Sequence, residues 1–266
     1  MRSSESPRTP LVAGNWKMHK TYAEAVSLAQ AVCDGLERGW RDKVEVLMCP
    51  PFTALRGVSN VIAFAHSWAK VGAQDCFWEP EGAYTGAVSV PMIADLDCAY
   101  CIVGHSERRG VFGETDEVVA RKAAALAQAG VTPIVCVGEP RDVYEAGDTV
   151  PFVRAQVATS LAGVDASRSG LVVAYEPLWA IGSGLVPAPE DAQAVAAAIR
   201  AELAGLPVGV GAQGARVLYG GSVRAANVAR FTACPDVDGV LVGGASLSAD
   251  SFVDIVKAVV TQAEVR

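Results

Sequence analysis

Short apolar runs alternate along the chain with longer stretches in which apolar positions recur at helical spacing. Most of these runs are apolar at nearly every position, which is typical of parallel strands buried on both faces. They are Leu11–Trp16, Val44–Cys49, Ala69–Asp75, Cys98–Gly104, Val131–Gly138, Gly170–Glu176, Arg216–Gly221 and Val237–Gly243. The pattern therefore predicts eight strands, each followed by a helical segment.

Capping signals mark the start of several helical stretches. Thr21 and Glu24 have the spacing of a capping box, and Thr115 precedes an acidic first turn. Pro189 is placed to open another helix, and Ser248 can cap the last one. Strands that alternate with helices of this length are expected to be parallel, because the chain must cross back over the sheet each time.

Eight strand–helix units in about 250 residues fit a closed (β/α)8 barrel of the α/β class better than an open doubly wound sheet. No Gly-x-Gly-x-x-Gly follows the first strand, which argues against a nucleotide-binding sheet. The composition does not change along the chain as it would at a linker. We therefore predict one catalytic domain, residues 11–266, after a flexible N-terminal tail, residues 1–10.

Composition and charge exclude several classes of protein. The chain is 51% apolar and 19% charged, which is too apolar for a disordered protein. Its net charge of −7 disfavours nucleic-acid and anionic-membrane partners, and no apolar run approaches the roughly 18 residues of a membrane span. The start of the chain lacks the pattern of a targeting signal, and seven widely spread cysteines fit reduced thiols. We expect a cytoplasmic protein.

Metal binding receives no support from the sequence. Cys98 and Cys101 have the spacing of a metal or redox pair, but they lie in a strand-like run. Residues three apart on a regular strand point to opposite faces, so we interpret both as structural. The three histidines, His19, His66 and His105, lack suitably spaced ligand partners. We expect no metal and no cofactor.

Polar residues follow the predicted strands. In a closed barrel the carboxyl ends of all strands meet at one face, where such enzymes carry their chemistry. A lysine after a strand is ordinarily solvated, and a glycine pair is ordinarily a tight turn, so only their joint placement favours a site. The residues placed there include Asn15, Lys17, Gln74, His105, Glu107, Glu176, Ser222, Gly243 and Gly244.

The two glycine-rich turns suggest how an acidic protein could bind an anion. Gly220-Gly221-Ser222 and Gly243-Gly244 follow the last two strands. Their backbone N–H groups can approach a phosphate closely, and helices begin just beyond them. Together with Lys17, they predict a local phosphate site at this face.

At these residues the chain resembles the triosephosphate isomerase family. The matching segments run in the family order over nearly the whole chain: residues 14–18, 72–75, 83–86, 103–109, 112–117, 174–184, 219–223 and 241–247. The resemblance implies a TIM barrel that interconverts dihydroxyacetone phosphate and D-glyceraldehyde 3-phosphate without a cofactor, in glycolysis and gluconeogenesis.

The resemblance also implies a role for each catalytic position. Glu176 would be the base, and His105 the neutral electrophile, kept uncharged by the helix start beside it. Lys17 would supply positive charge, Asn15 would orient the oxyanion, and Glu107 would support Lys17 and His105.

Substrate binding, lid and assembly follow in the same way. The phosphate would be bound by Gly182, Ser222, Gly243 and Gly244. The lid would run from Pro177 to about Val186 and include Leu178, Trp179, Ala180, Ile181, Gly182 and Ser183. Thr85 would reach toward Asn15 of a second copy, which implies a homodimer.

Some positions depart from the family pattern. Ser183 replaces a usual Thr, Leu185 replaces a common Lys or Arg, and Pro187 follows, which suggests a stiffer lid hinge. Ala87 replaces a usual acidic residue that could pair with Arg108 across the dimer. Arg200 and Asp238 match a family ion pair that we interpret as structural. Two alternatives stay open: a paralogue acting on a four-carbon ketose phosphate such as erythrulose phosphate, and a non-catalytic barrel scaffold.

Overall fold

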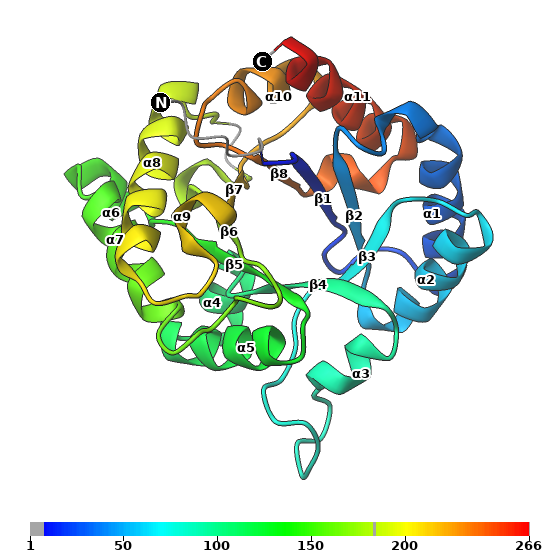
Figure 1. Cartoon of the computed structure of the whole chain (residues 1–266), viewed down its shortest axis with the longest axis horizontal. Coiled ribbons are helices and arrows are strands. Elements are labelled where there is room, and N and C mark those ends of the chain that lie inside the picture. The colour runs from blue at the N-terminus through cyan, green and yellow to red at the C-terminus, as the bar shows by residue number, and fades with distance from the viewer. Residues whose placement is uncertain (1–7, 183–184, 266) are drawn as a thin grey trace.

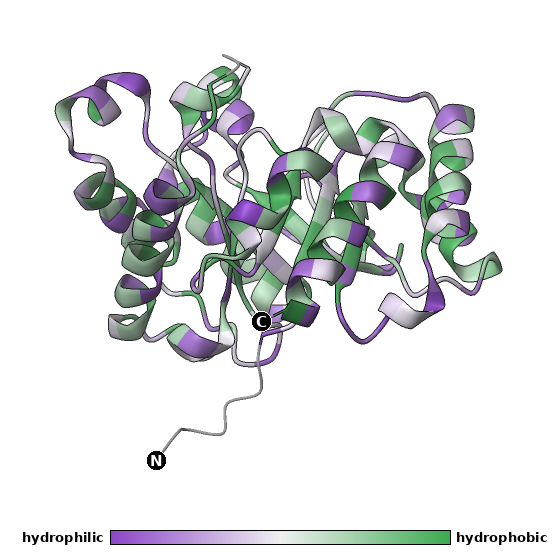
Figure 2. Cartoon of the chain, turned by 90° about the horizontal axis from the view of Figure 1, so that it is seen from above, coloured by the Kyte–Doolittle hydropathy of each residue, from purple (hydrophilic) through white to green (hydrophobic). Residues whose placement is uncertain are grey.

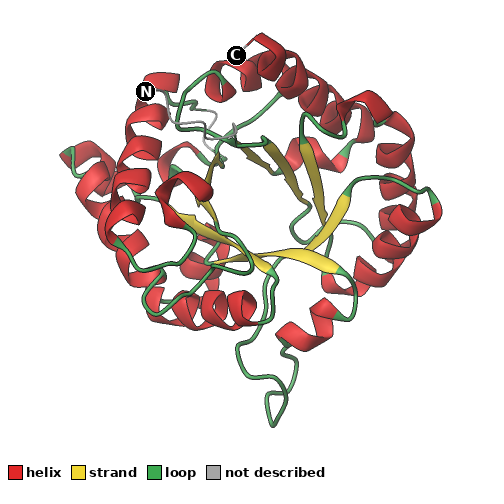
Figure 3. Ribbon diagram, viewed as in Figure 1, coloured by secondary structure: helices red, strands yellow, loops and turns green. Residues whose placement is uncertain are grey.

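The computed structural model describes residues 8–182 and 185–265, and within them eight parallel strands close into a barrel in chain order, β1 to β8. A ring of helices surrounds the strands (Figures 1 and 3). Each strand lies inside one predicted run, so the predicted (β/α)8 barrel is confirmed. The strands are β1 Leu11–Asn15, β2 Glu45–Cys49, β3 Lys70–Ala73, β4 Cys98–Val103, β5 Thr132–Val137, β6 Val172–Tyr175, β7 Arg216–Tyr219 and β8 Gly239–Val242.

The helices of the ring are banded polar and apolar, as expected when one face packs on the barrel (Figure 2). The α-helices are α1 Tyr22–Gly35, α2 Leu55–Phe64, α3 Val90–Ala94, α4 Ser106–Phe112, α5 Asp116–Gln128, α6 Arg141–Ala146, α7 Thr149–Ser160, α8 Pro189–Gly205, α9 Gly211–Gly214, α10 Ala225–Thr232 and α11 Ala249–Val265. Short 3₁₀ turns are η1 Arg38–Trp40, η2 Phe52–Ala54, η3 Leu178–Ala180 and η4 Gly244–Leu247. In the described part of the chain, no helix has both the length and the apolar character needed to cross a membrane.

The predicted helix starts are confirmed. The Glu24 carboxylate accepts hydrogen bonds from the N–H and the hydroxyl of Thr21, both at 2.8 Å. The Thr115 hydroxyl caps α5, and Pro189 is the first residue of α8. Ser248 Oγ accepts from the N–H of Ser251 at 3.5 Å, at the start of α11. Local side-chain chemistry thus sets where these helices begin.

The N-terminal end of the barrel is closed by a polar network. Glu45 Oε2 is 3.0 Å from Arg216 Nη1, and Glu45 Oε1 is 2.8 Å from Lys70 Nζ. The Tyr100 hydroxyl donates to Glu45 and accepts from Arg216. These side chains start β2, β3 and β7 or lie early in β4, so they meet across the barrel mouth.

The expectation that Cys98 and Cys101 face opposite sides of β4 is wrong. Both belong to the core cluster between the barrel and its helices. Val71 pairs with Cys98 but Gly72 pairs with Tyr100, so β4 carries one extra residue in a β-bulge. The bulge changes the alternation of side chains, which a regular-strand argument does not anticipate. Both thiols are free and buried.

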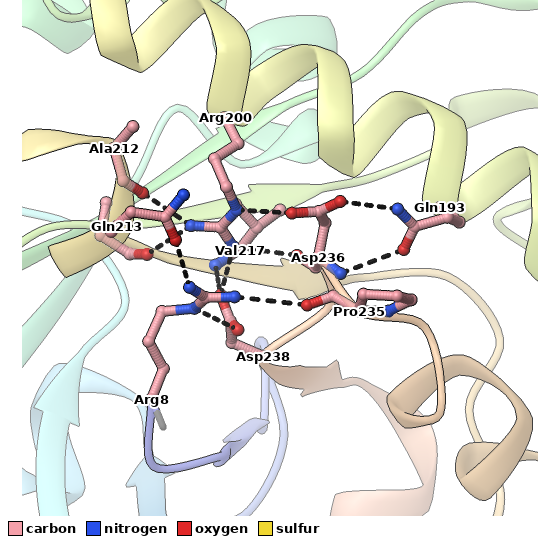
Figure 4. Close-up of polar contacts among 10 residues, drawn as sticks. Arg8, Gln193, Arg200, Ala212, Gln213, Val217, Pro235, Asp236 and Asp238 are labelled. Carbon is pink, nitrogen blue, oxygen red and sulfur yellow. Dashed lines mark hydrogen bonds and ion pairs between the residues drawn. The ribbon is translucent and has the colours of Figure 1, made fainter. Parts of the chain in front are cut away.

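The segment before β1 is bound to the residues that lead into β8, the strand that pairs with β1 (Figure 4). Arg8 Nε donates to Asp238 Oδ1 at 2.6 Å, and Arg8 Nη1 donates to Gln213 Oε1 at 2.7 Å. The other oxygen of Asp238 accepts from Arg200 Nη2 at 2.7 Å, and Arg200 Nε donates to Asp236 at 2.8 Å. Arg200 and Asp238 are both buried in this network, as a structural pair would be. Residues 1–7 of the predicted tail lie outside the described residues.

Candidate active site

A cavity of about 620 Å³ opens at the carboxyl ends of the strands. Its lining brings together the residues that the sequence singled out from five different strand ends. They include Asn15, Lys17, His105, Glu176, Gly182, Ser222, Gly243 and Gly244. Glu107 is not in the lining but contacts a residue that is.

Asn15 and Lys17 are held in place at the end of β1. Asn15 is buried, and its Oδ1 accepts the N–H of Lys17 at 3.0 Å. Lys17 has a φ of 54°, in the left-handed region that non-glycine residues seldom occupy. Gln74 Nε2 donates to the carbonyls of Lys17 and Cys49, at 2.9 and 2.8 Å. These bonds fix the strained turn, and with it the direction of the lysine side chain.

The Lys17 ammonium is anchored by Glu107 in the first turn of α4. Nζ lies 2.7 Å from Glu107 Oε1. A Cβ placed on Gly243 would lie 3.5 Å from Lys17 Cε, so the lysine stem passes close to the second glycine turn. The positive charge is therefore directed toward the glycine-rich side of the cavity.

His105 immediately precedes α4, and its ring is fixed at both nitrogens. Nδ1 accepts the N–H of Glu107 at 3.2 Å, and Nε2 lies 2.9 Å from Glu176 Oε1. Because Nδ1 accepts a hydrogen bond, the proton of the neutral ring is assigned to Nε2, which then donates to Glu176. Burial lowers the pKa of His105, but the hydrogen-bonded Glu176 carboxylate and the Glu107 carboxylate together outweigh it, and the net direction is upward.

Glu176 directly follows β6, and only 2% of its surface is exposed. Its second oxygen, Oε2, accepts the N–H of Ser106 at 2.9 Å. Burial raises the pKa of Glu176, but His105, the Ser106 N–H and Lys17 together hold that pKa below its ordinary value. The carboxylate is therefore ionised at neutral pH, although it is buried.

Glycines surround Glu176 and the opposite part of the cavity. A Cβ on Gly220 would lie 3.0 Å from Glu176 Cγ and 3.2 Å from the carbonyl oxygen of Tyr175, so a side chain there would press on Glu176. Gly243 precedes η4, and its carbonyl accepts the Ser246 hydroxyl at 2.7 Å. Apart from its chain neighbours, no described residue has an atom within 4 Å of a Cβ built on Gly244, which leaves its backbone open to the cavity.

The start of the predicted lid is attached to a residue that the sequence reasoning missed. Trp179, in η3, donates from its indole N–H to Glu139 Oε1 at 2.7 Å and stacks on Tyr144 with a ring separation of 3.9 Å. The Tyr175 hydroxyl donates to the same oxygen at 3.0 Å. Glu139 lies two residues beyond the end of β5, so its place after a strand was the available signal. Of the rest of the lid, Ile181 and Gly182 line the cavity, and Ser183 lies outside the described residues.

Thr85 does not line the cavity of its own chain. It lies exposed in the long loop between β3 and α3, which projects away from the barrel (Figure 1). Arg108, which the sequence suggested as an intersubunit partner, instead pairs within the chain. Its Nε is 2.7 Å from Glu114 Oε1 and its Nη2 is 3.2 Å from Asp75 Oδ2. Arg108 therefore has carboxylate partners within its own chain, although position 87 is an alanine.

The fold and the charged groups around the cavity define a (β/α)8-barrel enzyme. The model of the family "Triosephosphate isomerase" matches residues 10–259. The chain is 49% identical over 253 residues to the triosephosphate isomerase of Roseiflexus sp. (strain RS-1), covering 94% of this chain and 97% of the relative. It is 47% identical over 253 residues to that of Corynebacterium efficiens, covering 94% and 95%. It is 49% identical over 251 residues to that of Streptomyces coelicolor, covering 94% and 97%. The chain belongs to the triosephosphate isomerase family and is an isomerase of the intramolecular oxidoreductase class.

Proposed function

We propose that the chain interconverts dihydroxyacetone phosphate and D-glyceraldehyde 3-phosphate through an enediolate, with Glu176 as base and His105 as electrophile. The observation that carries the proposal is the buried pair itself, His105 Nε2 and Glu176 Oε1 at 2.9 Å, on the wall of a cavity that also holds Lys17. The names of the relatives support the three-carbon substrate, and none of the three reported above favours a four-carbon one.

Glu176 moves the proton between carbons. Its carboxylate removes a proton from C1 of dihydroxyacetone phosphate, which leaves an enediolate and a protonated Glu176, and then returns that proton to C2. In the ligand-free arrangement both oxygens are occupied, by His105 and by the Ser106 N–H. Substrate must therefore separate Glu176 from His105 before the base can reach carbon.

That separation also prepares His105. Without the Glu176 carboxylate beside it, the remaining influences are burial, which is the largest and lowers the pKa of the imidazole, Glu107, which raises it, and Lys17, which lowers it. The ring then stays neutral, and its Nε2–H can hydrogen-bond the substrate carbonyl oxygen and pass protons between the two oxygens. The backbone N–H of Glu107 keeps Nδ1 as the acceptor throughout.

Lys17 and Asn15 stabilise the negative charge that develops on oxygen, because both lie at the cavity wall in a fixed geometry. Glu107 positions Lys17 through the 2.7 Å contact. The phosphate is bound by backbone N–H groups of Gly182, Gly243 and Gly244 and by Ser222, in addition to Lys17. This arrangement lets an acidic chain bind a dianion without a basic surface.

The lid and the assembly complete the proposal. The lid, residues 177–186, closes over the cavity and excludes water, which strengthens the base and keeps the enediolate from losing phosphate. The chain acts as a cytoplasmic homodimer in which Thr85 approaches Asn15 of the partner subunit. Large apolar side chains left exposed support an interface, notably Met18 at 94% and Phe112 at 64%.

A coupled assay on glyceraldehyde 3-phosphate beside the erythrulose phosphates tests the substrate. We expect a much larger kcat/KM on the three-carbon substrate. A larger value on the four-carbon substrates would overturn the proposal, and a folded dimer that turns over neither would indicate the scaffold alternative.

A further inference from the structure

A second cavity, of about 790 Å³, lies at the opposite end of the barrel from the candidate active site. It lies where β3 and β4 begin, between η1 and α2. Among the described residues, the linings of the two cavities have no residue in common. Its volume is within the range of sites that bind small molecules.

The charge of this second cavity differs in sign from that of the chain. Arg38, Arg41 and Lys70 line it, against one carboxylate from Asp97 within the described part of the chain. Lys70 is already paired with Glu45 at 2.8 Å. The side chains of Arg38 and Arg41 form no hydrogen bond or ion pair with any described residue. Two guanidinium groups are therefore available to a ligand without displacing a protein carboxylate.

Trp68 adds a second, independent observation. It lines the cavity, and its indole N–H is buried without an acceptor among the described residues. By contrast, the indole N–H of Trp179 donates to Glu139 at 2.7 Å. The indole N–H has no surface open to the cavity, so the aromatic ring of Trp68 forms part of the wall, where it can report on a bound ligand.

The chain turns sharply at two points around the cavity. His66 has a φ of 48° and Asp97 a φ of 60°, and both line the cavity. His66 follows the end of α2 and Asp97 the end of α3, and their N–H groups donate to the Ala63 and Ala94 carbonyls at 3.1 and 3.0 Å. These left-handed residues end the two helices at the edge of the cavity and so help to shape its wall.

We propose that this cavity is a binding site for a phosphorylated small molecule. Arg38 and Arg41 pair with the phosphoryl oxygens, since guanidinium groups match phosphate geometry in a bidentate fashion. Lys70 adds positive charge, and the Trp68 ring forms part of the wall beside the ligand. The site is separate from the proposed catalytic one, so this proposal does not depend on which substrate the enzyme converts.

Titration calorimetry with pyrophosphate tests the site. The Lys17→Ala protein is used as background, so that binding at the candidate active site is weakened. Adding Arg38→Ala and Arg41→Ala is expected to weaken pyrophosphate binding by about tenfold or more, because both charge-assisted contacts are lost. The matched control adds Arg168→Ala and Arg230→Ala, which remove the same charge from arginines outside the cavity, and is expected to leave affinity within about twofold.

Two further measurements separate binding from general effects. Pyrophosphate is expected to change the tryptophan fluorescence of the Lys17→Ala protein, and the Trp68→Phe substitution to abolish that change. Arg38→Ala with Arg41→Ala, in an otherwise unaltered chain, is expected to leave kcat/KM on glyceraldehyde 3-phosphate unchanged. Equal affinity in the cavity and control variants, or no binding to the Lys17→Ala protein at millimolar pyrophosphate, would overturn the proposal.

Discussion

The two ends of the barrel each hold a largely buried carboxylate, but they surround it with different partners. At the N-terminal end, Glu45 contacts the permanent cations Arg216 and Lys70, at 3.0 and 2.8 Å, and a tyrosine hydroxyl. At the C-terminal end, Glu176 contacts a histidine at 2.9 Å and a backbone N–H at 2.9 Å. Both carboxylates have a lowered pKa, despite burial that raises it.

The difference shows which carboxylate can take part in chemistry. Burial lowers the pKa of Arg216, but Tyr100 and Glu45 raise it above its ordinary value, so Glu45 keeps a charged partner and the network closes the barrel mouth. His105 can lose its charge, and Glu176 faces a cavity into which a ligand can enter. A buried carboxylate becomes a usable base when its main partner is titratable and displaceable.

The largest expected effect is on kcat, and it distinguishes Glu176 from Glu45. Glu176→Gln keeps the shape of the side chain but removes the base, so kcat is expected to fall by about 10³-fold or more with a smaller change in KM. Glu176→Asp, whose carboxylate is withdrawn by one methylene, is expected to lose much of kcat as well. Steady-state kinetics measure both.

The matched control for that experiment is Glu45→Gln. Its kcat/KM is expected to stay within about threefold of the parent, since Glu45 lies at the opposite end of the barrel. Similar losses in Glu176→Gln and Glu45→Gln, or an unchanged kcat in Glu176→Gln, would mean that Glu176 is not the base.

The next effect tests how closely the C-terminal end positions its carboxylate. Gly220→Ala places a Cβ 3.0 Å from Glu176 Cγ, so it should displace the base and lower kcat by about 10²-fold. Gly205→Ala, at the end of α8, serves as control, since its Cβ meets no atom of another described element within 4 Å. If the two alanine variants had the same kcat, the close approach at Gly220 would have no catalytic consequence.

The third effect concerns stability, and here substitution of Glu45 is expected to matter more than substitution of Glu176. Glu45→Gln leaves Arg216 partly buried without its counter-charge, so the free energy of unfolding should fall by about 2–3 kcal/mol. This is less than for a fully buried pair, because Lys70, the second partner of Glu45, is half exposed and loses little when the charge of Glu45 is removed. Glu176→Gln removes a buried charge whose partner can become neutral, and its loss should be smaller. Urea denaturation of the two variants measures this, and an equal loss would contradict the assignment of Glu45 to stability.

Much of the fold was predictable because it depends on local patterns. The strand limits moved inward by at most two residues at either end, and the caps at Thr21 and Thr115 formed as the sequence indicated. The prediction that side chains alternate regularly between the two faces of β4 was wrong at Cys98 and Cys101. The β-bulge there depends on the pairing register between β4 and β3, which the sequence of β4 alone does not determine.

The site was predictable in its members but not in its contacts. Placement after strands brought Asn15, Lys17, His105 and Glu176 to one cavity. The partners that hold them come from distant positions, such as the Ser106 N–H on Glu176 and Gln74 on Lys17. The closure of the other end by Glu45 and Arg216 joins residues 171 positions apart, and no local pattern encodes such a pairing.

The smallest expected effect is a pKa shift that links the two members of the proposed catalytic pair. In the parent chain the pKa of His105 is raised above its ordinary 6.5, because Glu176 and Glu107 together outweigh burial. Glu176→Gln removes the larger of the two charges and leaves burial, Glu107 and Lys17, so the His105 pKa should fall relative to the parent, as read from the ring resonances by NMR titration.

The same pair should leave a signature in stability against pH. The contribution from the raised His105 pKa is full below about 6.5 and is lost as pH rises through the folded-state value. The contribution from the lowered Glu176 pKa is full above about 4.5 and is lost as pH falls through the folded-state value. The difference in unfolding free energy between the parent and Glu176→Gln should therefore be greatest between about pH 4.5 and 6.5. Glu45→Gln should show no decline of that difference above pH 6.5, because the pKa of its partner Arg216 is raised even above the ordinary arginine value. A difference for Glu176→Gln that stayed constant from pH 5 to 8 would show that His105 and Glu176 are not coupled in the folded chain.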